Sequence, residues 1–205
     1  MIARAQVFLL AAWSASIACA PRPVELGLWF EDGLAYRSAR IGDSITSDEL
    51  TRIEQLARAQ IAQAFSEFDV TVSASHDARF RVHVVEQLND QRVPHGGTFA
   101  GESRAIAGFG GSGAVNFEFV ANGATIFSPE SASRVELIEV LGRGIGRVAI
   151  HEFLHQLLPT AAIHDSKDPH SYEGNSPALV EGYYGELHWD IAQPWLQSRL
   201  APRPR

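Results

Sequence analysis

Two histidines and a glutamate lie within five consecutive residues in the last third of the chain, in the order His151-Glu152-Phe153-Leu154-His155. Residues four apart on an α-helix share one face, so His151 and His155 can offer imidazole nitrogens to a single metal ion. Glu152 is turned by about 100° from His151 around the helix axis, where its carboxylate can act as a general base without binding the ion. This HExxH spacing predicts a zinc (Zn²⁺) site with a water-activating carboxylate.

The helix that carries the motif is predicted from about Ser133 to Leu158 and is apolar on nearly every face, which is typical of a central, buried helix. Two histidines and a glutamate on such a helix are costly without polar partners or a metal. A glycine inside a helix lowers the stability of the helix by about 1 kcal/mol relative to alanine, and this segment has three, Gly142, Gly144 and Gly146. Either they permit close packing of a neighbouring element, or the helix begins only after Gly146. Pro159 ends it, because the residue before a proline avoids the α conformation.

The residues that follow resemble the motif of the metzincin clan of zinc peptidases, HExxHxxGxxH followed by Asp. Here the run is HEFLHQLLPTAAIHD, so the first five positions match. Leu158 stands at the glycine position and Ala161 at the position of the third histidine. His164-Asp165 lies three residues further on, with the His-Asp pair kept. A looser turn after the helix can still bring His164 to the metal.

The resemblance implies a zinc-dependent peptidase in which His151, His155 and His164 hold the ion and Glu152 is the catalytic base. It also implies a zincin-like fold of the mixed α/β (α+β) class. In such a fold a twisted sheet has an edge strand over the cleft, a backing helix, a central HExxH helix and a small C-terminal subdomain.

The methionine turn of the metzincins is absent, since Met1 is the only methionine. Residues 171–174 fall about where that turn should lie. Tyr172 can therefore take the place of the tyrosine that some metzincins hold near the zinc. Tyr183 and Tyr184 are alternative sources of a hydroxyl that stabilises an oxyanion.

A different third ligand is implied by the gluzincins, in which a glutamate on a following helix completes the site. Glu181 lies downstream of the motif on a segment that can be helical. The choice matters because imidazole is neutral and carboxylate is charged, so it changes the net charge of the site and the acidity of the water. Four further side chains are open as ligands: Asp165, Glu173, His170 and His188.

The elements before the motif predict a mixed α/β sheet against which the metal-binding helix packs. Thr46 and Glu49 have the capping-box spacing at the start of an amphipathic helix. Residues 89–113 are predicted to be a long surface connection, and residues 115–120 an edge strand over the cleft that pairs with an extended peptide. Other strands are expected at 26–30, 70–73, 80–85 and 124–127.

An apolar run over residues 7–18, preceded by a positive charge, predicts an export signal that is too short for a comfortable transmembrane helix. Ser16-Ile17-Ala18-Cys19 resembles a bacterial lipobox, in which the cysteine becomes the acylated first residue. Ordinary cleavage after Ala20 is the alternative, but it leaves Pro21 at the new N-terminus. Cys19 is the only cysteine in the chain, and it lies where a lipoprotein needs one.

We therefore expect residues 1–18 to be a lipoprotein signal peptide, residues 19–25 a tether and residues 26–205 a single zinc metallopeptidase-like domain. The expected location is extracytoplasmic, on a bacterial membrane through the lipid on Cys19, or secreted if Cys19 is not acylated. With no second cysteine, the mature domain has no internal disulfide, so its stability rests on its core and any metal.

The composition limits the class of partner. The 205-residue chain is long enough for one globular catalytic domain, and 45% of its residues are hydrophobic. Its formal net charge is −7 and it has no basic run, which disfavours nucleic-acid binding. A peptide or protein substrate is expected. The alternative from another class is a lipid-anchored binding protein, or a peptidase-derived pseudoenzyme, with a structural zinc site.

Overall fold

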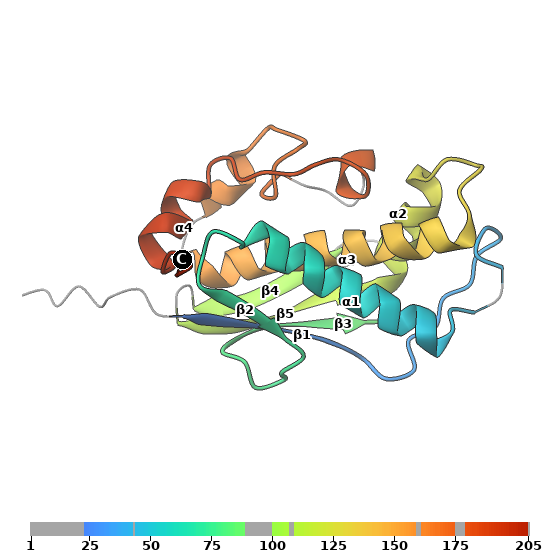
Figure 1. The fold of residues 1–205 in the computed structure, drawn as a ribbon, viewed down its shortest axis with the longest axis horizontal. Coiled ribbons are helices and arrows are strands. Elements are labelled where there is room, and N and C mark those ends of the chain that lie inside the picture. Colours follow the sequence, from blue (N-terminus) through green and yellow to red (C-terminus); the bar gives the residue numbers. More distant parts are fainter. Residues whose placement is uncertain are drawn as a thin grey trace, which may run out of the picture.

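The computed structural model describes residues 23–42, 44–88, 100–106, 109–158, 161–174 and 179–204. Within these residues the chain forms a mixed α/β fold with one five-stranded mixed sheet and four α-helices (Figure 1). The expected mixed α/β fold class is therefore confirmed. The strands are β1 (Val24–Phe30), β2 (Val70–Ser73), β3 (Phe80–Val85), β4 (Gly101–Ile106) and β5 (Gly110–Asn116). The helices are α1 (Ser47–Ala64), α2 (Phe117–Phe127), α3 (Arg134–Leu157) and α4 (Gln193–Arg199), with 3₁₀ turns η1 (Ala161–Asp165) and η2 (Val180–Gly182).

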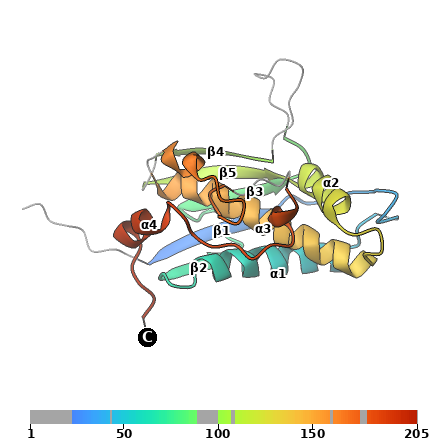
Figure 2. The ribbon, with the colours of Figure 1, turned by 90° about the horizontal axis from the view of Figure 1, so that it is seen from above.

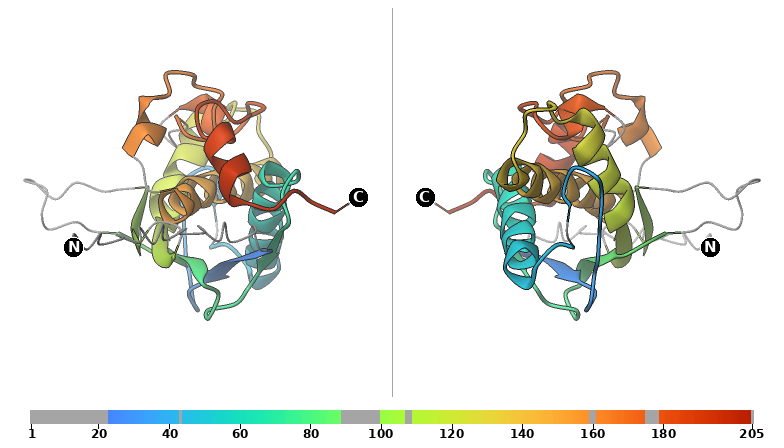
Figure 3. Two further views of the ribbon diagram at one scale, coloured as in Figure 1. Left: turned by 90° about the vertical axis from the view of Figure 1, so that its left-hand side faces the viewer. Right: turned by 90° about the vertical axis from the view of Figure 1, so that its right-hand side faces the viewer.

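The strand order in the sheet is β2-β1-β3-β5-β4. The first four of these strands are parallel, and β4 is antiparallel to β5 at the edge. Helices α1 and α3 cover the same face of the sheet, and the segment after α3 lies on the far side of α3 (Figures 2 and 3). Helix α3 is therefore enclosed between two layers. No helix of the described residues is both long and apolar enough to span a membrane.

The start of α1 follows the predicted capping box. The Thr46 hydroxyl accepts a hydrogen bond from the Glu49 amide, and the Glu49 carboxylate accepts one from the Thr46 amide at 2.8 Å. The same carboxylate pairs with Arg134 at the start of α3, at 2.6 Å. This pairing is the main reason that the pKa of Glu49 falls to about 2. The two helices are thus fastened together at their N-terminal ends.

Helix α3 runs without a break through its three glycines, which decides between the two sequence-based alternatives. A Cβ on Gly142 would lie 2.7 Å from the Leu56 Cβ, and one on Gly146 would lie 2.7 Å from the Ala57 carbonyl oxygen. Both contacts are with α1, and the two glycines lie one turn apart on the same face of α3. They are therefore required for close helix packing.

The opposite side of α3 is covered by the chain around residue 183. Tyr183 is fully buried, and its ring leaves no space for a Cβ on Gly144. Arg143 donates to the Tyr183 carbonyl oxygen at 3.0 Å, and the buried Arg147 donates to the Glu181 carbonyl oxygen. Two arginines on the helix thus hold the backbone of the covering segment.

Two of the expected strands are wrong. Residues 115–120 are not an edge strand, because β5 is an inner strand that ends at Asn116 and α2 follows. The Asn116 side chain caps α2 by accepting from the Phe119 amide at 3.0 Å. This helix also contains residues 124–127, which were expected to be a strand. The edge strand is β4, which lies inside the expected surface connection, and β1 begins at Val24, within the expected tether.

A methyl group on Gly146 tests the packing of α3 on α1. We expect Gly146→Ala to lower the free energy of unfolding by about 1–3 kcal/mol, because the added Cβ meets a backbone carbonyl that cannot move alone. Urea denaturation measures this loss. Val135→Ala in the same helix, where the side chain is 68% exposed, is the control and should change stability by less than about 0.5 kcal/mol. Equal stability of Gly146→Ala and the wild type would contradict the packing described here.

Candidate metal centre

Three imidazole rings converge at the C-terminal end of α3. His151 and His155 project from the helix, and His164 comes from η1 after the chain has turned back. The ring centroids of the three pairs lie 4.8, 5.1 and 4.9 Å apart. One nitrogen from each ring lies within 4.8 Å of the other two. The structure thus brings His164 to the histidine pair predicted from the motif.

The spacing of the His151 and His155 nitrogens matches that of two ligands of a tetrahedral zinc ion. Two ligands about 2.0–2.1 Å from such an ion lie about 3.3 Å apart, and the Nε2 atoms of His151 and His155 are 3.2 Å apart. Within the described part of the chain, no other group of three or more His, Cys, Asp or Glu side chains converges in this way. His164 is exposed, so the cluster opens to solvent on its side.

Burial keeps the histidines in the form that binds metal. Burial first, and then the neighbouring His155 and His164, lower the pKa of His151 to about 3. The backbone carbonyls of Glu173 and Tyr172 partly oppose this lowering, although the buried Nδ1 of His151 has no hydrogen-bond partner of good geometry. The pKa of His155 is also lowered, by burial and then by His164. Neutral imidazoles present a lone pair to a cation.

Glu152 follows His151 in the chain and lies on the side of α3 that packs against the edge strand. Its carboxylate is buried against Gly101 of β4, where a Cβ would overlap its Oε1 atom. The Oε2 atom is buried without a hydrogen-bond partner. Burial and the charge of Glu102 raise the pKa of Glu152 to about 8, and the nearby Ser103 hydroxyl partly opposes this rise. A buried carboxylate oxygen with no partner is costly unless a ligand or water completes it.

A polar side chain that the sequence interpretation missed holds α3 on the sheet. Gln156 is fully buried, accepts from the Arg81 amide and donates to the Arg81 carbonyl oxygen, each at 3.0 Å. It also donates to Ser103, whose hydroxyl donates to the Glu152 carbonyl oxygen at 3.0 Å. The signal in the sequence was a lone glutamine in an apolar helix, which must find polar partners inside the protein.

The role expected for Tyr172 near the metal stays a prediction, and its side chain packs between α1 and the C-terminal segment. Its ring is buried and packs on Trp189 with centroids 4.7 Å apart. The hydroxyl hydrogen-bonds to Gln60 of α1, while burial raises its pKa. A buried aromatic ring packs where apolar surface is available, and here that surface lies between α1 and the C-terminal segment. The backbone of Tyr172 also acts on the site, because its carbonyl raises the pKa of His151.

The other side chains considered as ligands lie outside the cluster. The buried Glu173 carboxylate accepts from the Ala192 amide at 2.6 Å and from the Asp190 amide at 3.0 Å, so it fixes the turn into α4. His188 pairs with Asp168 at 3.0 Å. The metal-binding group of three histidines includes none of the remaining candidates, which are Asp165, His170 and Glu181. Of the alternative tyrosines, Tyr183 donates to the Val120 carbonyl oxygen and Tyr184 to Ser128.

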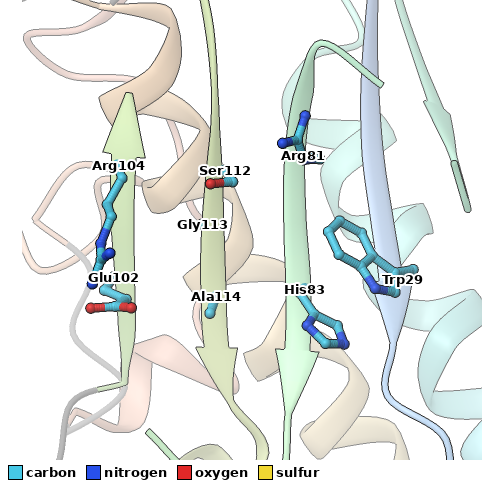
Figure 4. Close-up of a pocket in the computed structure, with 8 residues that line it drawn as sticks. All are labelled: Trp29, Arg81, His83, Glu102, Arg104, Ser112, Gly113 and Ala114. Atoms are coloured by element: carbon cyan, nitrogen blue, oxygen red, sulfur yellow. The ribbon is translucent and has the colours of Figure 1, made fainter. Parts of the chain in front are cut away.

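A separate furrow of about 380 Å³ lies on the face of the sheet opposite to the helices (Figure 4). The short side chains of Ser112 and Ala114 on β5 form its floor, with His83 on one side and Glu102 on the other. The His83 ring is stacked on Trp29 with centroids 4.7 Å apart. The furrow contains none of the three clustered histidines, so it is not part of the candidate metal centre.

Comparison of the chain with protein-family models, with curated proteins and with solved structures gave no match. Cys19 and the expected signal peptide, residues 1–18, lie outside the described residues.

The buried His151 and Glu152 set opposite pH limits on the stability of the metal-free protein. The pKa of His151 falls from 6.5 to about 3 on folding, so the unfolded chain binds the extra proton and stability falls as the pH drops from 6.5 towards 3. The pKa of Glu152 rises from 4.5 to about 8, so the native state binds the extra proton and stability falls as the pH rises from 4.5 towards 8. We expect urea denaturation in a chelator to give the highest stability between about pH 4.5 and 6.5.

Glu152→Gln separates these two effects. The variant should no longer lose stability as the pH rises from 4.5 towards 8, and it should still lose stability as the pH drops from 6.5 towards 3. Each unit of pKa shift corresponds to about 1.4 kcal/mol of unfolding free energy. The same alkaline loss in the variant and the wild type would show that Glu152 is not its source.

Proposed function

We propose that this protein is a zinc-dependent peptidase of divergent metzincin-like type. The observation that carries the proposal is the convergence of His151, His155 and His164 beside a buried carboxylate oxygen of Glu152 that lacks a partner. A structural histidine cluster has no need of a buried carboxylate with an open acceptor position. A hydrolase needs one, because the attacking water must lose a proton.

The three histidines would hold the ion, and each residue near it would have a distinct part. Bound zinc supplies a Lewis acid that polarises the scissile carbonyl and acidifies a water molecule. Glu152 accepts the proton of the attacking water and returns it to the leaving amine. Its position on α3, one residue after His151, would keep its carboxylate near a bound ion, and β4 shields this carboxylate from bulk solvent.

The peptide would bind to the outer edge of β4 rather than to residues 115–120. β4 is the terminal strand of the described sheet, so its outer backbone groups face away from β5. An extended peptide can pair with such an edge by strand addition. Because Gly101 and Ser103 of β4 contact Glu152, a peptide on this edge lies close to the reacting groups.

The N-terminal expectations remain part of the proposal. Acylation of Cys19 after removal of residues 1–18 would anchor the enzyme on the outer side of a bacterial membrane. β1 begins at Val24, which leaves residues 19–23 between the lipid and the sheet. Such a short connection would keep the catalytic domain at the membrane surface.

Glu152→Gln is the direct test of the catalytic part. We expect the variant to keep one zinc per chain and to lose hydrolysis of a peptide library by about 10²- to 10⁴-fold, because the general base is gone and the ligands are intact. Glu181→Gln is the matched control, with the same substitution outside the cluster, and should keep both zinc and activity. Undiminished hydrolysis by Glu152→Gln, or a zinc-loaded wild type that cleaves no peptide, would contradict the proposal.

His164→Ala tests the third ligand. Removing one of three imidazoles should weaken zinc binding by more than about 100-fold, since even loss of a group that only supports a ligand costs 10- to 100-fold. Competition with a fluorescent chelator measures this affinity. Unchanged affinity in His164→Ala, together with a loss in Glu181→Gln, would move the ligand role to Glu181.

A further inference from the structure

The absence of a side chain at Gly101 leaves the space that the Glu152 carboxylate occupies. A Cβ at this position would overlap Glu152 Oε1 and would lie 3.0 Å from both Glu152 Cδ and Val148 Cγ1. The backbone of Gly101 is not in the left-handed region, so its conformation is open to any residue. The glycine is therefore required for space and not for its φ angle.

The same strand also fixes the backbone next to this carboxylate. Side chains alternate along a strand, so positions 101 and 103 of β4 face α3 while Glu102 faces the furrow on the other side (Figure 4). Ser103 donates to the Glu152 carbonyl oxygen at 3.0 Å. Gly101 is itself paired with Val115 of the inner strand β5. The backbone of β4 is thus held at a set distance from α3.

We propose that Gly101 is a positioning residue that determines where the Glu152 carboxylate lies relative to the three histidines. This inference rests on the proposed function for its effect on catalysis. Between the two groups that would overlap, the Glu152 side chain is the one that can move, because its carboxylate is the end of a flexible chain and β4 is held by its neighbour. A methyl group at position 101 therefore displaces the carboxylate and leaves the sheet and the histidines in place.

The kinetic test is Gly101→Ala. We expect kcat for peptide hydrolysis to fall by at least 10-fold, with KM within about 3-fold of the wild type and one zinc still bound per chain. A residue that only supports the fold would instead lower zinc content or the fraction of folded protein along with activity. Wild-type kcat in Gly101→Ala would overturn the inference.

A double-mutant cycle on stability tests the same contact without any activity. In metal-free protein, Gly101→Ala should lower the Tm when Glu152 is present and should lower it less, or raise it, when combined with Glu152→Ala. The contact with Val148 is common to both backgrounds, so the cycle isolates the carboxylate. Equal Tm shifts in the two backgrounds would overturn the inference.

These two readouts separate the inference from the proposed function. If the zinc-loaded wild type hydrolyses no peptide, the proposed function fails, while the cycle still reports whether Gly101 and Glu152 are coupled. If Gly101→Ala alone does not fold, the double variant Gly101→Ala/Glu152→Ala should regain the far-ultraviolet circular dichroism of the wild type. Failure of the double variant to fold would count against the inference, because the overlap would then lie elsewhere.

Discussion

Helix α3 lies between the sheet, α1 and the C-terminal segment, so each polar group on it needs a partner from one of these neighbours. Gln156 finds partners on two strands, and Arg147 finds them on the carbonyls of the covering segment. Gly142 and Gly146 let α1 approach closely enough to complete the enclosure. At the C-terminal end of the helix, the histidine cluster opens to solvent on the side of the exposed His164.

This enclosure explains the electrostatics of the site. Desolvation keeps His151 neutral and raises the pKa of Glu152 to about 8, so in the metal-free protein the cluster carries little charge. A divalent cation would reverse that balance, since its positive charge stabilises a nearby carboxylate and neutral imidazoles are its preferred ligands. Burial of these polar groups destabilises the metal-free protein. The same burial would strengthen the attraction between a bound ion and the Glu152 carboxylate. His151 and Glu152 therefore affect both the stability of the metal-free protein and the proposed chemistry of the metal centre.

The features that were predicted from sequence are those with a local signal. The HExxH spacing, the capping box at Thr46 and the extent of α3 depend on residues close in the chain. The misassigned elements depend on distant contacts. β4 is stabilised by pairing with β5, and nothing in its glycine- and serine-containing surroundings marks it as a strand. The direction of the Tyr172 ring is likewise decided by distant contacts, with Trp189 and with α1. The role of Gly101 becomes visible only when Glu152 lies against it.

The direct test of the proposed centre is the coordination shell of zinc in the loaded protein, measured by a crystal structure with anomalous data at the zinc edge. We expect one ion bound by His151, His155 and His164 at about 2.0–2.1 Å, with a fourth position open to water and the Glu152 carboxylate nearby but not bound. A shell closed by a fourth protein side chain, or the absence of zinc from this cluster when the ion is supplied in excess, would contradict a catalytic metal centre.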